Sequence, residues 1–257
     1  RLLAFARQVE GMVYVRPGEF LMGSPLGSQT PPNEQPRRRL HVPGFFISRT
    51  EVTNADYAEF VATKGAETPR HWTTPRRLPS GRVEGKTYAA DLAKHPVVWV
   101  SWEEARAYAR WRGGDLPSEA QWEKAARGTD GREYPWGDGR RLKGRPVRAH
   151  VHVDPTRLRR APTSPVGAHG DDESPYGVYD MAGNVEEWVR DTFERYPGAP
   201  AGAEADPDKR VLRGGSFRWP WPDARCPRRS RADPSYRKDR IGFRVVIEVP
   251  ESVPELR

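Results

Sequence analysis

The residues best suited to chemistry are sparse in this 257-residue chain. Cys226 is the only cysteine, which excludes an internal disulfide, and no histidine follows His169. One thiolate without a neighbouring cysteine, methionine or histidine cannot build a centre for a soft metal such as Cu(I). The sequence contains no P-loop, G-x-S-x-G or HExxH motif. The chain therefore lacks the usual patterns for thiolate–metal, nucleotide-phosphate and hydrolytic chemistry.

One histidine pair has a spacing that suits a metal. His150 and His152 are two residues apart, so on a β-strand both side chains would lie on one face. Neutral imidazoles are common metal ligands. The alternative is an ordinary pair of surface histidines, which is the more frequent outcome of such a spacing.

The segment 213–244, RGGSFRWPWPDARCPRRSRADPSYRKDRIGFR, has the composition of a binding surface instead. It holds nine arginines and the aromatic pair Trp219 and Trp221. Tryptophan, tyrosine and arginine dominate binding hot spots, because each buries a large area with few rotamers or offers several donors. Pro220 and Pro222 favour an extended, irregular loop. We expect these aromatic residues to be exposed; the alternative is that they face inward and add to the core.

The elements that would position this segment are short. Capping-box spacings predict helices over 53–65, 101–113 and 116–128. Apolar patterning predicts a hairpin over 11–24, a strand region over 40–52, a buried strand over 95–100 and strands at both ends of 213–244. The polar, Pro- and Gly-containing stretches 66–94, 129–175 and 194–209 are expected to be long loops. Together they predict a single mixed α+β domain over residues 1–257.

Several motifs together resemble the formylglycine-generating-enzyme, or sulfatase-modifying-factor, superfamily. They are GMVYVRPGEFLMGS, RTEVTNADYAEFV, HPVVWVSWEEARAYARWRGGDLPSEAQWEKAARG, YPWGD, SPYGVYDMAGNVEEWVRD and RVLRGGSF…IGFRVV, in the family's order over nearly the whole chain. The resemblance implies a C-type-lectin-like fold with short sheets, two main helices and long loops. Six tryptophans in apolar or helical contexts are expected in its core: Trp99, Trp102, Trp111, Trp122, Trp136 and Trp188.

The resemblance also implies where a catalytic centre would be. Members that oxidise a sulfatase cysteine carry two copper-binding cysteines shortly after GGS. The matching positions here are Trp219 and, approximately, Ala224, while Cys226 resembles a separate, structural position. We therefore expect a protein that is not an enzyme. A formylglycine-generating-type oxidase, or a related enzyme of the superfamily, is the alternative.

Within the superfamily, segment 213–244 most resembles the variable region of diversity-generating retroelement variable proteins. In those proteins a region between RGGSW and IGFR is mutated at template adenines, and the frame of Arg229, Pro234 and Arg237 before IGFR is matched here. The resemblance implies scaffold positions at Gly214, Gly215, Ser216, Arg225, Arg229, Arg237 and Gly242. It implies exposed, ligand-binding positions at Arg218, Trp219, Trp221, Arg228, Ser230, Arg231, Tyr236, Lys238, Asp239 and Arg240, with Phe217 assignable to either group.

A structural calcium site is also implied, in DMAGNVEE. Its ligands would be the side chains of Asp180 and Glu187 and the backbone carbonyls of Gly183 and Val185, and such oxygen ligands suit calcium. The alternative is that the two acidic side chains cap turns or pair with arginine. No other cofactor is expected.

Composition limits the partners. The net charge is +8, and 36 of the 43 basic residues are arginine, spread along the whole chain without a clustered basic helix. Nucleic-acid binding is therefore not expected. We expect a monomer that binds a protein or a cell-surface ligand. The many loop prolines suit a heat-stable protein. No apolar run reaches the length of a membrane span and no signal peptide is visible, so membrane insertion is not expected and the cellular location stays open.

Overall fold

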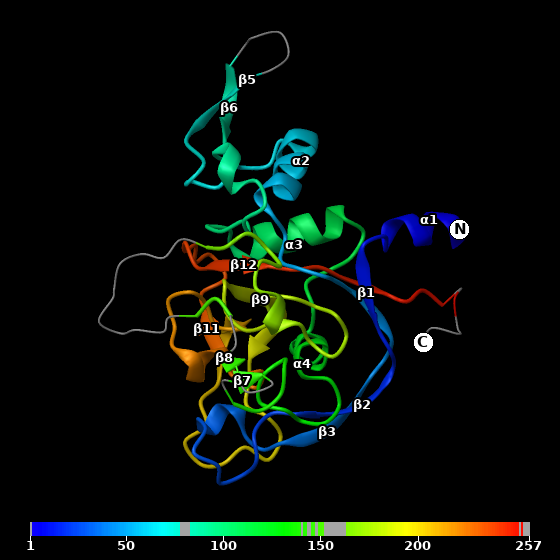
Figure 1. The fold of residues 1–257 in the computed structure, drawn as a ribbon, viewed down its shortest axis with the longest axis vertical. Coiled ribbons are helices and arrows are strands. Elements are labelled where there is room, and N and C mark those ends of the chain that lie inside the picture. The colour runs from blue at the N-terminus through cyan, green and yellow to red at the C-terminus, as the bar shows by residue number, and fades with distance from the viewer. Residues whose placement is uncertain are drawn as a thin grey trace.

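The computed structural model describes residues 2–77, 83–139, 141–142, 145–146, 149–151, 163–251 and 253. Figure 1 shows short helices set around small sheets and long loops, which confirms the predicted α+β class. The resemblance implied two main helices, whereas the described residues contain three helices of similar length. They also contain a shorter helix near the N-terminus, which was not predicted. The helices are α1 (Leu2–Gln8), α2 (Asn54–Lys64), α3 (Trp102–Trp111) and α4 (Glu119–Arg127).

All three predicted capping boxes are present. At the start of α2, the Thr53 hydroxyl accepts the Asp56 N–H at 3.2 Å, and the Asp56 carboxylate accepts the Thr53 N–H at 3.0 Å. The starts of α3 and α4 have the same reciprocal arrangement. These side chains satisfy backbone donors that a helix start leaves unpaired, which explains why the helix boundaries could be predicted from local sequence.

The predicted hairpin within 11–24 is wrong, because its two strands pair with other strands. Instead, two stretches of the chain form a long antiparallel ribbon that is interrupted once. The pairing register is the same on both sides of this break. Pro17 and Pro43 lie in that break, and neither has an N–H to give to a ladder. In Figure 1 the ribbon curves around one side of the molecule. Its paired strands are β1 (Met12–Val15) with β4 (Phe45–Ser48), and β2 (Gly18–Met22) with β3 (Arg38–Val42).

The sheet that carries segment 213–244 has the order β11-β10-β9-β12. β10 pairs with β9 antiparallel and β12 pairs with β9 parallel, so both ends of the segment are strands, as predicted. Arg213 faces Glu187 and Ile241 faces Glu186, so both ends meet at the start of β9. The strands are β9 (Glu186–Phe193), β10 (Asp206–Arg213), β11 (Ser230–Ala232) and β12 (Ile241–Phe243), while β13 (Val246–Glu248) pairs with β4.

The predicted strand over 95–100 is also wrong. Val97, Val98 and Val100 are buried, but the backbone of Trp99 is left-handed, with φ of 63°. An extended strand cannot continue through that conformation. The Trp99 N–H instead donates to the Lys238 carbonyl at 2.9 Å, inside segment 213–244.

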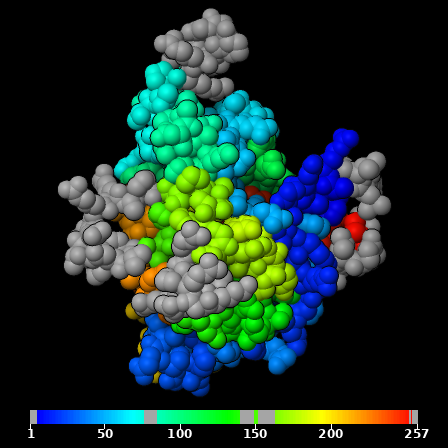
Figure 2. Space-filling view, viewed as in Figure 1, coloured from blue at the N-terminus to red at the C-terminus, as the bar shows by residue number. Residues whose placement is uncertain are grey.

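Strands occur in all three expected loop regions, since β10 begins at Asp206, within 194–209. β5 (Thr74–Arg77) and β6 (Val83–Thr87) form a hairpin that stands out from the body next to α2 (Figures 1 and 2). β7 (Arg141–Leu142) and β8 (Arg145–Pro146) pair over two residues each. None of the helices in the described part of the chain has the length and hydropathy of a membrane-spanning segment.

Hydrophobic clusters lie on both faces of β9. Val189 packs with Trp122 of α4, whereas Trp188, on the opposite face, packs with Tyr57 of α2 and Tyr108 of α3. Of the six tryptophans expected in the core, Trp102, Trp122 and Trp188 are buried, and Trp99, Trp111 and Trp136 are half-buried.

Charged residues form part of this interior. Arg213, at the end of β10, is fully buried and donates to Glu119 at 2.8 Å and to Glu123 at 2.5 Å, both on α4. Arg127 donates to the other oxygen of Glu123 at 2.7 Å. This chain of ion pairs fixes α4 to the point where segment 213–244 begins.

We expect Arg213→Met to lower the free energy of unfolding by about 3–5 kcal/mol, because the substitution leaves two buried carboxylates without their shared partner. Arg39→Met is the matched control: Arg39 pairs with Glu19 at the surface at 3.2 Å, and exposed pairs contribute about 0–1 kcal/mol. Urea denaturation of both variants measures the difference. Equal losses would contradict the structural role assigned to Arg213.

Candidate ligand-binding face

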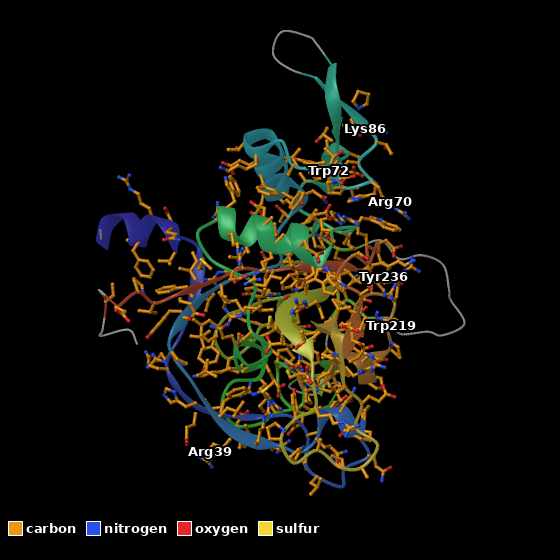
Figure 3. The ribbon with its side chains drawn as sticks, turned by 180° about the vertical axis from the view of Figure 1, so that it is seen from behind. Arg39, Arg70, Trp72, Lys86, Trp219 and Tyr236 are labelled. Atoms are coloured by element: carbon orange, nitrogen blue, oxygen red, sulfur yellow. The ribbon has the colours of Figure 1, made fainter. Side chains whose placement is uncertain are left out.

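Segment 213–244 forms one face of the molecule. In Figure 3, Trp219 and Tyr236 lie along the same edge, with Arg70 next in line above them. Trp219 is 38% exposed and Tyr236 is 36% exposed. Of the large hydrophobic side chains in the described residues, only Leu26 is more exposed, at 65%. The aromatic exposure predicted for this segment is therefore confirmed at Trp219 and Tyr236.

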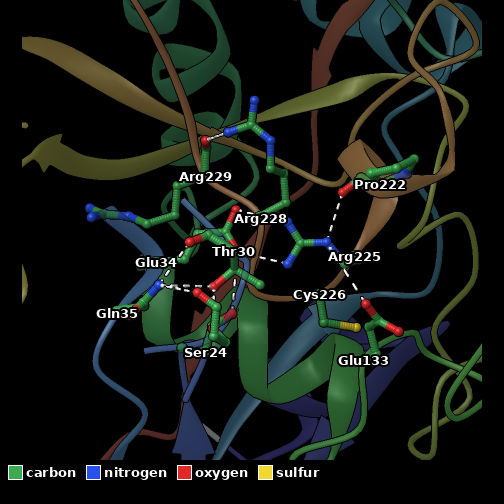
Figure 4. A network of polar contacts seen from close by, with 12 residues as sticks. Ser24, Thr30, Glu34, Gln35, Glu133, Pro222, Arg225, Cys226, Arg228 and Arg229 are labelled. Carbon is green, nitrogen blue, oxygen red and sulfur yellow. Dashed lines mark hydrogen bonds and ion pairs between the residues drawn. The ribbon is translucent and has the colours of Figure 1, made fainter. Parts of the chain in front are cut away.

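Buried arginines hold the segment in place from below. Arg225 makes a bidentate pair with Glu34, at 2.8 and 3.0 Å, and also donates to the Pro222 carbonyl (Figure 4). Arg229 makes a bidentate pair with Glu119 at 2.6 and 3.0 Å. Bidentate guanidinium–carboxylate pairs fix geometry as well as charge. Arg225 and Arg229 are thus buried anchors, in agreement with the scaffold role predicted for them.

Arg237, the third arginine predicted as scaffold, is different. It is exposed, yet it makes a bidentate pair with Glu104 of α3 at 2.9 and 3.0 Å. It therefore ties the segment to α3 from the surface.

Most of the charged positions expected to bind a ligand are paired within the protein. Arg218 pairs with Asp239, also in the segment. The remaining pairs are Arg228 with Asp223 at 2.8 Å, Arg231 with Glu204 at 2.6 Å and Arg240 with Glu186 at 3.2 Å. The Lys238 ammonium lies 5.2 Å from the Tyr236 ring centre, a cation–π contact. Ser230 is half-buried on β11.

The exposure predicted for Trp221 is wrong. Trp221 is only 8% exposed and packs edge-on against Tyr134 and Trp136, which stack on each other. Its place in the short helical turn Trp221–Ala224, after Pro220, directs the ring inward. Phe217, left open in the sequence, is buried at 5% exposure. The candidate face therefore does not include the Trp221 and Phe217 rings.

Glu186 also belongs to this face, and no pattern in the sequence indicated it. Glu186 is buried at the start of β9, where its carboxylate accepts the Trp219 indole N–H at 3.0 Å and the Arg240 guanidinium at 3.2 Å. Trp219, Glu186, Arg228 and Ser230 line a cavity of about 90 Å³. Trp219 thus occupies the first position matched to a copper-binding cysteine, and its indole is held by a buried acid.

Trp99 and Arg70 extend the same face beyond the segment. The Arg70 guanidinium lies 3.6 Å from the centre of the Trp99 ring. A left-handed backbone at a bulky residue is an outlier and is often found at functional sites. Sequence reasoning placed Trp99 in a buried strand because a tryptophan among valines gives no sign of this conformation.

The only cysteine lies in the interior. Cys226 is fully buried, and burial raises the pKa of its thiol to about 12. Its backbone is held by hydrogen bonds to Glu133 and Arg213. A buried thiol that stays protonated at neutral pH is a poor nucleophile.

One of the two side chains of the implied calcium site, Glu187, is already paired within the protein. Both oxygens of Glu187 accept from Arg244, at 2.6 and 2.7 Å, and one also accepts the Trp122 indole N–H. One oxygen of Asp180 accepts the Gly167 N–H at 2.6 Å, and its other oxygen is buried without a hydrogen-bond partner among the described residues. The Glu187 contacts agree with the alternative in which that acid pairs with arginine, and calcium binding stays a prediction to be tested.

Of the two histidines whose spacing would suit a metal or an ordinary surface pair, only His150 lies among the described residues. His150 is described and half-buried, whereas His152 lies among the residues that are not described. The strand expected to carry both is therefore not tested.

The fold is the C-type-lectin-like fold of formylglycine-generating enzymes and variable proteins. The chain superposes on PvdO from Pseudomonas aeruginosa with a TM-score of 0.72, at 29% identity, over 93% of this chain and 94% of that one. It superposes on Treponema denticola variable protein 1 with a TM-score of 0.64, at 20% identity, over 93% and 95%. At 20% identity the second likeness concerns the fold alone.

Sequence comparison places the chain within a family. The model of the sulfatase-modifying factor enzyme 1-like domain matches residues 3–249, so the chain belongs to the sulfatase-modifying-factor family. It is 33% identical to the formylglycine-generating enzyme of Streptomyces coelicolor, over 93% of this chain and 89% of that protein. It is 34% identical to the serine/threonine-protein kinase Pkn1 of Chlamydia trachomatis, over 93% of this chain but only 38% of the kinase. The chain thus spans less than two-fifths of that relative.

We expect calcium to leave the thermal midpoint of unfolding unchanged, because the Glu187 carboxylate is already neutralised by Arg244. The measurement is differential scanning calorimetry of the chain with 1 mM EGTA and with a millimolar excess of CaCl₂. A thermal midpoint that rises with calcium concentration, as linkage requires for an ion bound to the folded chain, would show that calcium is bound and contradict this prediction.

Cys226 should not react with a disulfide reagent such as DTNB in the native protein at pH 8. With a pKa near 12 in the folded state, the thiolate is scarce at that pH, and burial also blocks access. One equivalent should react after unfolding in urea. Rapid reaction of the folded chain would show an accessible, activated thiol and would favour an enzyme.

Proposed function

We propose that this protein is a non-catalytic ligand-binding member of its family, with segment 213–244 as the binding face. The observation that supports it best is the division of that segment. Buried arginines fix its backbone, whereas Trp219 and Tyr236 remain exposed at the surface. Exposed aromatic side chains on a rigid frame are the usual anchors of protein–protein interfaces, so the ligand proposed is a protein or a cell-surface component.

The charges of the face favour a polar protein ligand over nucleic acid. Arg218, Arg228, Arg231 and Arg240 each have a carboxylate partner within the protein. A nucleic-acid surface would present such cations to phosphates instead. These ion pairs surround the exposed aromatic residues with groups of both charges, as in the polar rims of protein–protein interfaces.

The runner-up is an enzyme of the same family, and the family relationship favours it. Against it stand the single, buried thiol and the tryptophan at the position matched to a copper-binding cysteine. The retroelement-driven variation proposed for segment 213–244 distinguishes the two, because an enzyme keeps its site whereas a variable binding protein changes it.

The test is to sequence this gene in many sibling isolates. We expect substitutions concentrated at Trp219, Arg231, Tyr236, Lys238 and the other surface positions, with the buried Arg225, Arg229 and Trp221 unchanged. An invariant segment, or changes spread evenly over buried and exposed positions, would reject diversification of this face.

The same division predicts unequal tolerance to substitution. Trp219→Ala and Tyr236→Ala should each lower the free energy of unfolding by about 1 kcal/mol or less, since both side chains are partly solvated. Trp221→Ala should cost about 3–5 kcal/mol, because it removes a buried ring from a packed aromatic cluster. Urea denaturation of the three variants checks this; similar losses at Trp219 and Trp221 would mean that Trp219 is a core residue.

A further inference from the structure

Two cations of the binding face are held on aromatic rings instead of carboxylates. The Arg70 guanidinium lies 3.6 Å from the centre of the Trp99 ring, and the Lys238 ammonium lies 5.2 Å from the centre of the Tyr236 ring. Within the described residues neither cation forms an ion pair, whereas all nine arginines of segment 213–244 do. Building on the proposed function, we propose that Arg70 and Lys238 bind an acidic side chain of a protein ligand.

Arg70 is held by the flat face of its guanidinium. At 3.6 Å the group lies directly over the Trp99 ring, in the stacked contact that arginine often makes with aromatic residues. A guanidinium carries its N–H donors in its own plane, so stacking leaves the edge of the group available to another partner. Arg70 is exposed, and its side chain has no hydrogen-bond acceptor among the described residues. A carboxylate accepts two such donors at once.

The backbone of Trp99 links the two cations. Trp99 is half-buried among the buried valines of 97–100, and its left-handed backbone, with φ of 63°, interrupts that run. Its N–H donates to the Lys238 carbonyl at 2.9 Å. A strained conformation persists only where the surrounding structure enforces it, and such residues cluster at functional sites. The ring that supports Arg70 is therefore joined directly to the residue that carries the second cation, on the edge shown in Figure 3.

The surrounding charges favour a carboxylate on a protein over the phosphates of a nucleic acid. Arg237, next to Lys238, pairs with Glu104 at 2.9 Å, and Asp239 on its other side pairs with Arg218. Nucleic-acid binding depends on many free cations, because each neutralised phosphate adds to the affinity. Two free cations between paired charges match a single acidic side chain, as in the polar rim of a protein–protein interface.

The place of Arg70 in the chain separates it from the residues proposed to vary. Arg70 lies in the loop between α2 and β5, outside segment 213–244, whereas Lys238 lies inside the segment. Arg70 is thus a constant contact, which remains when the side chains of the segment change. Ligands of different variants of the face therefore share an acidic group.

The experiment measures binding of a fluorescently labelled hexa-aspartate peptide by anisotropy in about 0.15 M NaCl, where long-range attraction between charges is screened. Arg70→Gln should weaken binding at least about fivefold, because it removes a charge-assisted bidentate contact. Arg110→Gln is the matched control: it removes an exposed arginine near the end of α3 that forms no ion pair in the described part of the chain. It should change binding less than about twofold. Equal weakening by the two variants, or no binding by wild type, overturns the proposal.

An oligothymidylate of the same net charge as the peptide tests the class of ligand. It should bind more weakly than the peptide, because the other cations of the face are already neutralised. Binding of the oligonucleotide that is as tight as that of the peptide, and equally sensitive to Arg70→Gln, overturns the assignment to a protein carboxylate.

Trp99→Leu tests whether the ring positions Arg70. In that background Arg70→Gln should weaken peptide binding less than it does in wild type, since the guanidinium has already lost its support. Equal weakening in both backgrounds overturns the positioning role of Trp99. Circular dichroism and the urea midpoint of each variant show that the fold is retained.

These results can be told apart from a failure of the proposed function. An invariant segment 213–244 together with a selective loss in Arg70→Gln would reject diversification and keep the carboxylate site. A variable segment together with equal weakening by Arg70→Gln and Arg110→Gln would keep diversification and reject the site.

Discussion

Buried guanidinium groups are the interaction on which the rest of this structure depends. A fold with so many loops leaves many backbone carbonyls without a partner in a helix or sheet, and each would cost free energy if buried unpaired. Arg127 donates to three such carbonyls, those of Arg132, Gly23 and Gly131, while it pairs with Glu123. Arg229 donates to the carbonyls of Asn33 and Glu194 while it pairs with Glu119. One planar guanidinium with five donors therefore satisfies several backbone carbonyls that would otherwise need hydrogen bonds in a helix or sheet.

This arrangement explains why the interior contains so much charge. A buried ion pair is often no more stabilising than an apolar replacement of the same volume, because desolvation offsets the attraction. An apolar side chain could not, however, satisfy the loop carbonyls that Arg127, Arg229 and Arg244 bind. Lys124 acts in the same way, donating to the carbonyls of Arg16 and Gly18 at 2.7 and 2.9 Å, and burial lowers the pKa of its ammonium to about 8. The charged core is thus a consequence of an irregular backbone.

Local features could be predicted from the sequence, and features set by distant partners could not. The helix starts at Thr53, Ser101 and Ser118 were predicted correctly, because a capping box is complete within four residues. The pairing of β1 with β4 was missed, because the partner lies about thirty residues away and Pro17 gave a stronger local turn signal. The fold could still be predicted, because the family motifs occur in the family's order along nearly the whole chain.

The same reasoning applies to the binding face. Trp219 and Trp221 are two residues apart between prolines, and composition alone does not distinguish them. Their different environments come from Glu186, which holds the Trp219 indole near the surface, and from Tyr134 and Trp136, which receive Trp221. Both sets of partners come from elements far away in sequence.

A scaffold that is fixed by buried pairs can tolerate change above them. Arg213, Arg225 and Arg229 reach their carboxylates through side chains that point into the protein, so their geometry does not depend on Trp219 or Tyr236. The surface pairs, such as Arg218 with Asp239, are solvated and contribute little to folding. Replacing them alters what the face presents to a ligand while the backbone stays where α4 and β9 hold it. Under the proposed function, the division between a charged interior and a replaceable surface would allow one fold to carry different binding faces.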